Sequence, residues 1–293
     1  MTSPMNAKRV ALVTGASSGI GKAIVGRLLS DGLTVYGAAR RVDQMQDIRA
    51  QGARIVALDL TNEESMQAAV ATLLEAEGRI DVLVNNAGYG LFGAIEDVPI
   101  DEARRQFEVN VFGLARLSQL VLPAMRGARS GKIVNISSMS GRIWSPIGSW
   151  YDASKHAVEV LSDALRVETR PFGIQVVVVQ PGAIKSEWAT IAAEQLMASS
   201  KGSAYKALTD AVAQGLRNTS GAGPEVIAAA VSRAVHSTRP RRRYTLPLDA
   251  KALIFLHWLL PTGAWESLIG FVIRTMGRMA NEGPASVRQT SRS

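Results

Sequence analysis

Short apolar runs alternate with amphipathic stretches along the first 180 residues of the chain. The apolar runs, each typical of a buried strand, lie at 10–14, 34–38, 55–59, 82–85, 133–137 and 175–180. Between them, apolar residues recur at helical spacing over 20–29, 63–76, 101–125 and 151–169. With a weaker last run at 243–246, this alternation predicts a doubly wound, Rossmann-type α/β domain: a parallel sheet of about seven strands with helices on both faces.

Polar and glycine-rich residues follow several predicted strands, at 15–21, 86–88, 138 and 181–182. Right-handed crossovers place the carboxyl ends of parallel strands along one edge of the sheet. We therefore expect these residues to converge on one crevice, which is where open α/β sheets bind their ligands.

A glycine-rich segment, 14–21, joins the first predicted strand to the first predicted helix. Its spacing is Gly-x-x-x-Gly-x-Gly, and it lies in a strand–turn–helix–strand unit of about thirty residues, the context that a dinucleotide-binding fingerprint requires. Glycines let the backbone approach a pyrophosphate, and the start of the helix offers it free N–H groups and a positive dipole. The segment therefore predicts a dinucleotide site.

The residues after the second predicted strand indicate which dinucleotide binds. An acidic residue about twenty positions beyond the fingerprint would hold the ribose 2′-hydroxyl of NAD. Here Arg40 and Arg41 stand at that place, and the first acid, Asp43, lies further along the chain. Because a guanidinium binds a 2′-phosphate and a carboxylate repels it, we expect NADP(H) rather than NAD(H).

Tyr151 and Lys155 form a candidate proton-transfer pair. They lie four residues apart, which places them on one face of a helix, and Ser138 precedes Tyr151 by thirteen residues. An ammonium beside a phenol favours the phenolate, so it lowers the pKa of the tyrosine towards the range in which acid–base catalysis works best. Taken alone, a tyrosine and a lysine at this spacing also occur on ordinary protein surfaces.

Together these motifs resemble the short-chain dehydrogenase/reductase family over residues 8–190, and are similar to its NADP(H)-preferring, hydroxysteroid dehydrogenase-like members. Segment 14–21 resembles the family's cofactor loop, and segment 85–88 its second signature. Asn110, Ser138, Tyr151 and Lys155 match its catalytic tetrad. The residues that the resemblance places around the cofactor are Thr14, Gly15, Ser17, Ser18, Gly19, Ile20, Gly21, Arg40, Arg41, Asp59, Leu60, Asn86, Ala87, Gly88, Tyr151, Lys155, Pro181, Gly182, Ile184 and Ser186.

The resemblance also implies a role for each member of the tetrad. Tyr151 exchanges a proton with the substrate oxygen, and Ser138 orients that oxygen by a hydrogen bond. Lys155 lowers the pKa of Tyr151 and holds the nicotinamide ribose, while Asn110 anchors a water molecule that relays protons. One position departs from the family pattern, because Ser186 stands where threonine is usual.

Aromatic residues near the catalytic positions indicate a hydrophobic substrate. The candidate substrate-binding residues are Ser138, Tyr89, Trp144 and Trp188. An aromatic wall suits a steroid-, retinoid- or lipid-like molecule, although ordinary packing explains the same residues equally well. We expect an NADP(H)-dependent oxidoreductase acting on a secondary alcohol or ketone. The alternatives are a 3-oxoacyl-thioester reductase and a non-catalytic regulatory protein that binds NADP(H).

Composition narrows the partners of the chain. It has no cysteine and three scattered histidines, so disulfides and thiolate nucleophiles are excluded and no metal site is predicted. The net charge of +8 comes without a nucleic-acid-binding motif, so we expect a small-molecule substrate and no nucleic acid. No signal peptide precedes the first strand, which favours a cytoplasmic protein. The family resemblance implies a homodimer or homotetramer.

Residues 247–293 form an apolar helical extension of the catalytic domain, 1–246, whose substrate-loop region is about 183–225. Two apolar pieces, 252–260 and 265–273, flank a Pro-Thr-Gly turn. Neither reaches the ~18 apolar residues of a membrane span, so we favour a cap on the substrate cleft or a dimer surface over peripheral membrane contact through 252–279. Residues 281–293 are predicted to be disordered.

Overall fold

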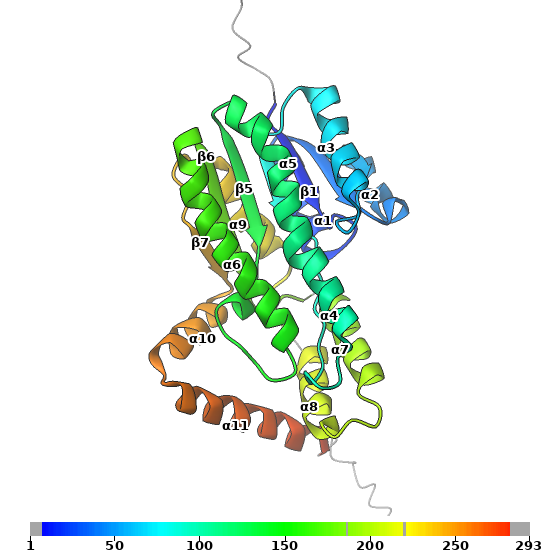
Figure 1. The fold of residues 1–293 in the computed structure, drawn as a ribbon, viewed down its shortest axis with the longest axis vertical. Coiled ribbons are helices and arrows are strands. Elements are labelled where there is room, and N and C mark those ends of the chain that lie inside the picture. Colours follow the sequence, from blue (N-terminus) through cyan, green and yellow to red (C-terminus); the bar gives the residue numbers. More distant parts are fainter. Residues whose placement is uncertain (1–7, 186, 219–220, 282–293) are drawn as a thin grey trace, which may run out of the picture.

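The computed structural model (Figure 1) describes residues 8–185, 187–218 and 221–281. Seven strands, all parallel, form one sheet in the order β3-β2-β1-β4-β5-β6-β7. The order of the chain reverses between β1 and β4, so the loops after these two strands flank the crevice at the carboxyl edge. The strands are β1 (Val10–Thr14), β2 (Thr34–Ala39), β3 (Arg54–Ala57), β4 (Val82–Asn85), β5 (Gly131–Ile136), β6 (Ile174–Pro181) and β7 (Arg243–Leu246).

Helices cover both faces of the sheet, which confirms the doubly wound architecture (Figure 1). Side chains of a strand alternate between the faces, and each face has its own hydrophobic core. Ala11 and Val13 of β1 pack with α1 and α9 on one face, whereas Val10 and Leu12 pack with α3 and α5 on the other. The helices that make these layers are α1 (Gly19–Ser30), α2 (Gln46–Ala50), α3 (Glu63–Glu77), α4 (Ile100–Phe107), α5 (Leu114–Gly127), α6 (Ser149–Thr169) and α9 (Glu225–His236).

Two parts of the helical layers differ from the prediction. The predicted helix at 101–125 consists of α4, a π-helical turn over Glu108–Gly113, and α5. The prediction also omitted α9, although Ile227, Val231 and Val235 recur along it at intervals of four and are fully buried. This helix covers the sheet beside α1, so part of this layer of the core lies beyond the part of the chain that carries the motifs.

The last helices lie beyond the carboxyl edge of the sheet (Figure 1). α8 packs against both α7 and α11, and α10 follows β7. The two predicted apolar helices of the C-terminal extension are therefore present. No helix in the described ranges is long and apolar enough to cross a membrane. These helices are α7 (Glu187–Ser199), α8 (Lys206–Arg217), α10 (Leu248–Leu259) and α11 (Thr262–Asn281).

Two predictions concern residues outside the described ranges. Ser186 is one of them, so its contact with a cofactor stays a prediction. The other is the disordered tail: α11 continues to Asn281, where disorder was expected to begin, and residues 282–293 lie outside the description.

Candidate active site

Tyr151, Ser138 and Lys155 meet at the carboxyl edge of the sheet. Ser138 follows β5, whereas Tyr151 and Lys155 lie one turn apart on α6. All three are buried, with no more than 8 % of their surface exposed. The Ser138 side chain contacts the phenol of Tyr151. Lys155 Nζ lies 5.8 Å from the centre of the Tyr151 ring. The fold therefore brings together the three residues that the sequence singled out.

Ser138 and Lys155 are each held by the backbone. The Oγ of Ser138 accepts a hydrogen bond from the N–H of Ser140 at 3.1 Å, which leaves the hydroxyl proton of Ser138 to donate elsewhere. Lys155 Nζ donates to the carbonyl oxygen of Ile136, at the end of β5, at 3.0 Å. Both polar groups thus have a defined direction before any substrate is present.

Burial determines the protonation states of Tyr151 and Lys155. It raises the pKa of Tyr151 to about 12, an effect that contact with Ser138 only partly offsets. It lowers the pKa of Lys155 to about 8, although the charge of Glu159 acts the other way. The expected lowering of the Tyr151 pKa by Lys155 is therefore not found in the protein alone, because loss of hydration penalises both charged forms. At neutral pH the phenol carries its proton.

Asn110 connects the catalytic helix to the loop after β4. It lies in the π-helical turn, a local widening that often occurs at functional sites. Its Nδ2 donates to the carbonyl of Tyr89 at 2.9 Å and to Oγ of Ser154 at 3.1 Å. Its Oδ1 accepts from the N–H of Tyr89 at 3.1 Å. Both polar atoms of Asn110 are thus bound to protein groups, and the water relay towards Lys155 stays a prediction.

The glycine-rich loop has room for glycine alone at three positions. Gly15 and Gly19 have φ angles of 67° and 50°, a region that other residues avoid. A Cβ atom on Gly21 would lie 2.1 Å from the carbonyl oxygen of Gly15. Ser18, which precedes α1, makes no capping hydrogen bond with its side chain, so the first N–H groups of this helix face outward without that partner. These features fit a bound pyrophosphate.

Hydrogen bonds join the loops on the two sides of the crevice. Thr14 Oγ1 accepts from the N–H groups of Asn86 at 3.0 Å and Ala87 at 2.9 Å. The side chain of Asn86 donates to the carbonyl of Thr14 at 3.0 Å. A Cβ atom on Gly88 would lie 2.9 Å from Oδ1 of Asn110. The predicted cofactor residues after β1 and β4 thus form one continuous wall that ends at the tetrad.

The predicted adenosine end of the site contains an exposed cationic pair. Arg40 and Arg41 follow β2 with exposed side chains, and Asp59 and Leu60 follow β3. Burial raises the pKa of Asp59, but hydrogen bonds from Thr61 and the charge of Arg40 hold it below its ordinary value. The charge of Arg40 therefore acts at the edge of the crevice, where an anionic group of a cofactor would meet it.

The segment after β6 closes the other end. Pro181 ends the strand and is buried. The N–H of Gly182 donates to the carbonyl of Leu246 at 2.7 Å, and Ile184 forms a β-bridge with Ala222. These bonds hold the segment at the strand ends, beside the end of β5 that leads into Ser138. The fixed backbone suits the nicotinamide end that the resemblance assigns to it.

Aromatic rings surround the catalytic phenol. The ring of Tyr151 lies 5.7 Å from that of Phe92 and 5.5 Å from that of Trp188, measured between ring centres. Phe92 and Trp188 also contact each other edge to face at 5.8 Å. Gly90 makes room for this group, because a Cβ atom there would lie 2.5 Å from the Trp188 ring. The structure thus places Trp188, one of the predicted substrate residues, beside Tyr151, the candidate proton donor.

The other two predicted aromatic contacts have different surroundings. The carbonyl of Trp144 accepts a hydrogen bond from Nε1 of Trp265, in α11, at 3.4 Å. Burial raises the pKa of Tyr89, and the charges of Glu102 and Arg40 also act on its hydroxyl. No hydrogen bond to the buried Tyr89 hydroxyl is found within the described residues, and Trp144 contacts the C-terminal helices through its backbone carbonyl.

The sequence analysis did not identify three buried polar residues of α6, which are Asp152, Ser154 and Glu159. Burial raises the pKa of Asp152 to about 6. Glu159 accepts a hydrogen bond from Nε of Arg243, in β7, at 2.8 Å. The available signal was their spacing, because positions 152 and 159 share a helical face with Lys155.

Curated proteins similar to this chain include reductases. A probable short-chain type dehydrogenase/reductase, VdlC, of Helicobacter pylori is 34% identical over 90% of this chain and 97% of its own length. The 3-ketodihydrosphingosine reductase of Bacteroides thetaiotaomicron is 43% identical over 59% of this chain and 63% of its own. The NADPH-dependent 3-dehydrocapnine reductase of Ornithobacterium rhinotracheale is 39% identical over 61% of this chain and 66% of its own.

A solved structure and a family profile agree with the geometry of the site. The crystal structure of a short-chain dehydrogenase from Streptomyces avermitilis is 34% identical, with a TM-score of 0.73 over 94% of this chain and 99% of that chain. The profile described as short chain dehydrogenase matches residues 9–196, a span that contains the glycine-rich loop and the whole candidate tetrad. The chain therefore belongs to the short-chain dehydrogenase family of oxidoreductases.

Proposed function

We propose that this oxidoreductase uses NADP(H) to interconvert a hydrophobic ketone and the corresponding secondary alcohol. The observation that carries the proposal is the buried contact between Tyr151 and Ser138, with Lys155 beside them, at the end of a cradle shaped for a dinucleotide. When bound there, a nicotinamide supplies or accepts the hydride.

In the reductive direction the protein positions and protonates the carbonyl oxygen. Ser138, whose hydroxyl contacts the phenol of Tyr151, donates its proton to the substrate oxygen in a hydrogen bond that orients it. Tyr151, which keeps its proton at neutral pH, donates it to the developing alkoxide. The ammonium of Lys155 stabilises the phenolate that remains. In oxidation the same phenolate accepts the proton of the substrate hydroxyl.

Three observations support NADP(H) as the cofactor. Arg40 and Arg41 follow β2 with exposed guanidinium groups, and a guanidinium pairs with a 2′-phosphate. The Ornithobacterium rhinotracheale relative is named as NADPH-dependent. No acidic residue stands directly after β2 to bind a free 2′-hydroxyl.

The aromatic wall supports a lipid-like substrate. Phe92 and Trp188 present their rings to the phenol of Tyr151. Two relatives are named as reductases of 3-ketodihydrosphingosine and of 3-dehydrocapnine, which bear a ketone at the third carbon. We therefore place the reacting ketone at Tyr151 and an apolar chain of the substrate along Trp188.

Removal of one hydroxyl group tests the mechanism. Tyr151→Phe should lower kcat about 10²–10⁴-fold and leave NADPH binding nearly unchanged, because only the proton donor is lost. Tyr205→Phe is the matched control, since it removes an exposed hydroxyl that is bonded to Glu96. NADPH absorbance measures turnover and fluorescence titration measures binding. If Tyr151→Phe kept most of its activity, another group would have to be the acid.

A substrate panel tests the substrate class. Long-chain 3-keto lipids should give a higher kcat/KM than short ketones, steroid ketones or 3-oxoacyl thioesters. We expect this order because we propose that the flexible apolar chain of these lipids packs along the rings of Phe92 and Trp188. A preference for thioesters would support the 3-oxoacyl-thioester reductase instead. Tight NADPH binding with no turnover of any compound would support the non-catalytic regulator.

A further inference from the structure

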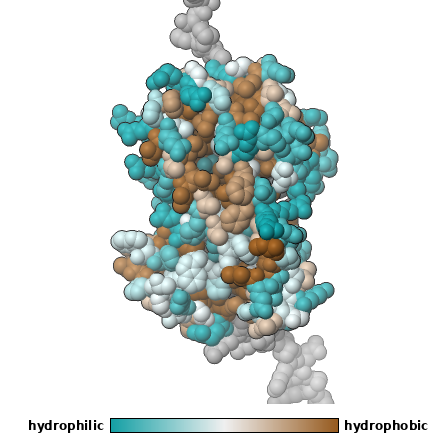
Figure 2. All heavy atoms as spheres, viewed as in Figure 1, coloured by the Kyte–Doolittle hydropathy of each residue, from teal (hydrophilic) through white to brown (hydrophobic). Residues whose placement is uncertain are grey.

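One side of α10 exposes large apolar side chains in a continuous stripe. Leu248, Phe255, Trp258 and Leu259 are 77%, 60%, 74% and 60% exposed, respectively. Positions 248, 255, 258 and 259 all fall on one side of a helix with 3.6 residues per turn. In Figure 2 this helix lies at the lower left edge of the molecule, where brown side chains reach the surface. Exposed apolar patches of this kind mark interaction sites.

The opposite side of the C-terminal extension is firmly packed. Ala250 is 1% exposed and lies against Gly182, where a Cβ atom would come within 2.6 Å of its side chain. Trp265, at the start of α11, is also 1% exposed and packs its ring against His257 at 4.7 Å. The fold therefore holds the apolar stripe outward in a fixed orientation.

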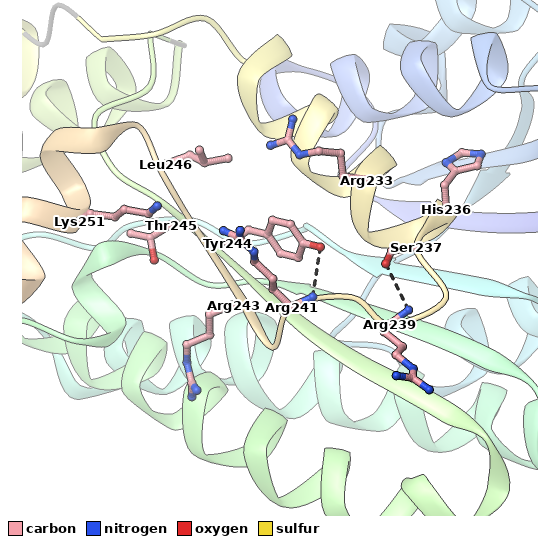
Figure 3. A pocket seen from close by; sticks show the side chains of 10 residues that line it. All are labelled: Arg233, His236, Ser237, Arg239, Arg241, Arg243, Tyr244, Thr245, Leu246 and Lys251. Atoms are coloured by element: carbon pink, nitrogen blue, oxygen red, sulfur yellow. Dashed lines mark hydrogen bonds between the residues drawn. The ribbon is translucent and has the colours of Figure 1, made fainter.

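A cationic pocket of about 730 Å³ adjoins this helix. Figure 3 shows side chains from the end of α9, the following loop, β7 and the start of α10 around it. Arg243 is neutralised by ion pairs with Glu159 and Asp163. The side chains of Arg233, Arg239, Arg241 and Lys251 form no ion pair with any residue in the described ranges.

Lys251 belongs to both features. It lines the pocket, and it lies three residues after Leu248 and four before Phe255, within the apolar stripe of α10. The stripe and the pocket are therefore parts of one surface, on which aromatic and aliphatic side chains adjoin cations that have no ion-pair partner among the described residues. Helices that rest on anionic membranes combine these two groups: the apolar side chains enter the boundary of the acyl chains, and the cations bind lipid phosphates.

We propose that this surface, made of the α10 stripe and the cationic pocket, docks on an anionic lipid bilayer. α10 lies flat on the interface and does not cross it, because it has 12 residues and a span needs about 20. A second copy of the chain fits less well, because a symmetric dimer would bring the cations of both protomers into one interface, and the pocket lining has no acidic residue to pair with them. The sequence alone favoured a cap or a dimer surface; the outward stripe and the pocket favour the bilayer.

The docked orientation has a consequence for the enzyme. Ala250 of α10 contacts Gly182, in the segment that closes the crevice beside the catalytic residues. A bilayer against α10 would thus lie near the segment that follows β6, which suits the lipid-like substrate of the proposed function. Docking itself depends only on the surface, so it can be tested without turnover.

Sedimentation with vesicles tests the proposal on the full chain. We expect binding to phosphatidylcholine vesicles that contain roughly a third phosphatidylglycerol, little binding to phosphatidylcholine alone, and loss of binding in about 0.5 M NaCl. Phe255→Ser/Trp258→Ser and Arg239→Glu/Arg241→Glu should each weaken binding about tenfold or more. The Trp258 fluorescence should shift to the blue on anionic vesicles, and Trp258→Phe should remove that shift.

Matched control variants distinguish vesicle binding through this surface from a general effect of net charge or of exposed apolar side chains. The charge control is Arg49→Glu/Arg126→Glu, which changes the net charge by the same amount as Arg239→Glu/Arg241→Glu, at exposed residues that form no ion pair in the described ranges. The apolar control is Ile95→Ser, which removes an apolar side chain that is 65% exposed. Both should bind vesicles like the wild type, and thermal unfolding should show that all variants fold. Equal loss in the two charge variants, or binding that ignores lipid charge, would overturn the proposal. So would a dimer that Phe255→Ser/Trp258→Ser dissociates.

Discussion

At the residue scale, the charge that follows β2 determines which cofactor fits. Arg40→Asp should weaken NADPH binding about tenfold or more, ~1.4 kcal/mol, because a carboxylate repels the 2′-phosphate. NADH binding should stay the same or become tighter. Arg49→Asp makes the same charge change at an exposed position of α2 and should alter neither affinity. Fluorescence titration gives both affinities, and a wild type that binds NADH as tightly as NADPH would contradict the assignment.

The pKa of a buried lysine predicts the pH dependence of reduction. Burial lowers the pKa of Lys155 to about 8, so its ammonium is present below that pH and is lost as the pH rises through it. Tyr151, with its pKa raised to about 12, keeps its proton over this range. Because the ammonium stabilises the phenolate that reduction produces, kcat/KM should be constant at neutral pH and fall above about pH 8.

A pH profile of ketone reduction checks this expectation. The wild type should show one inflection near the pKa of Lys155, and Lys155→Met should have low activity without that inflection. A wild-type profile that stays level through pH 8 would show that the charge of Lys155 is not needed in the rate-limiting step.

At the element scale, the site depends on how closely α1 approaches the loop before it. Gly21→Ala should weaken NADPH binding about tenfold or more, because the added Cβ would lie 2.1 Å from the Gly15 carbonyl and would push the loop out of place. Gly26→Ala is the control on the same helix, where the nearest atom is the flexible end of Gln51 at 3.3 Å. Calorimetric titration measures both, and equal affinities would show that the loop tolerates the shift.

The helix α6 combines several functions in one element. It carries Tyr151 and Lys155 towards the crevice, and Ser154 receives the hydrogen bond from Asn110. Its buried acid Glu159 pairs with Arg243 of β7, which anchors the edge strand of the sheet. The same helix therefore links the catalytic residues to the strand that leads into the C-terminal extension.

At the scale of the whole molecule, a second apolar surface predicts a dimer. Phe112, Val160 and Val167 are 56%, 69% and 73% exposed, and Figure 2 shows an apolar band between α5 and α6. Val160→Asp/Val167→Asp should convert the expected dimer or tetramer to a smaller species, since charge replaces apolar contact. Light scattering after size exclusion measures the mass. Phe255→Ser/Trp258→Ser should leave the mass unchanged, and a mass unaffected by the aspartates would place the interface elsewhere.

The sequence predicted which residues meet at the candidate site more completely than it predicted the helices around that site. The spacing of Gly15, Gly19 and Gly21 requires only local backbone geometry, and the strand ends converge whenever the sheet is parallel. Trp188 lies beside Tyr151, but this contact depends on a segment that follows the last motif, and a role of Trp188 in substrate binding stays a prediction. The helix α9 was missed because no motif marks it, although its apolar residues complete the core beside α1.

What the sequence determined by itself was the alternation of strands and helices, the glycine-rich turn and the helical pairing of Tyr151 with Lys155. These depend on residues close together in the chain, whose preferences act locally. Only the tertiary structure decided that burial, and not the Lys155 charge, controls the pKa of Tyr151. It also decided that the apolar stripe of α10 faces outward beside a cationic pocket. Desolvation and surface placement depend on residues far apart in the chain, which become neighbours only when the sheet and its helices assemble.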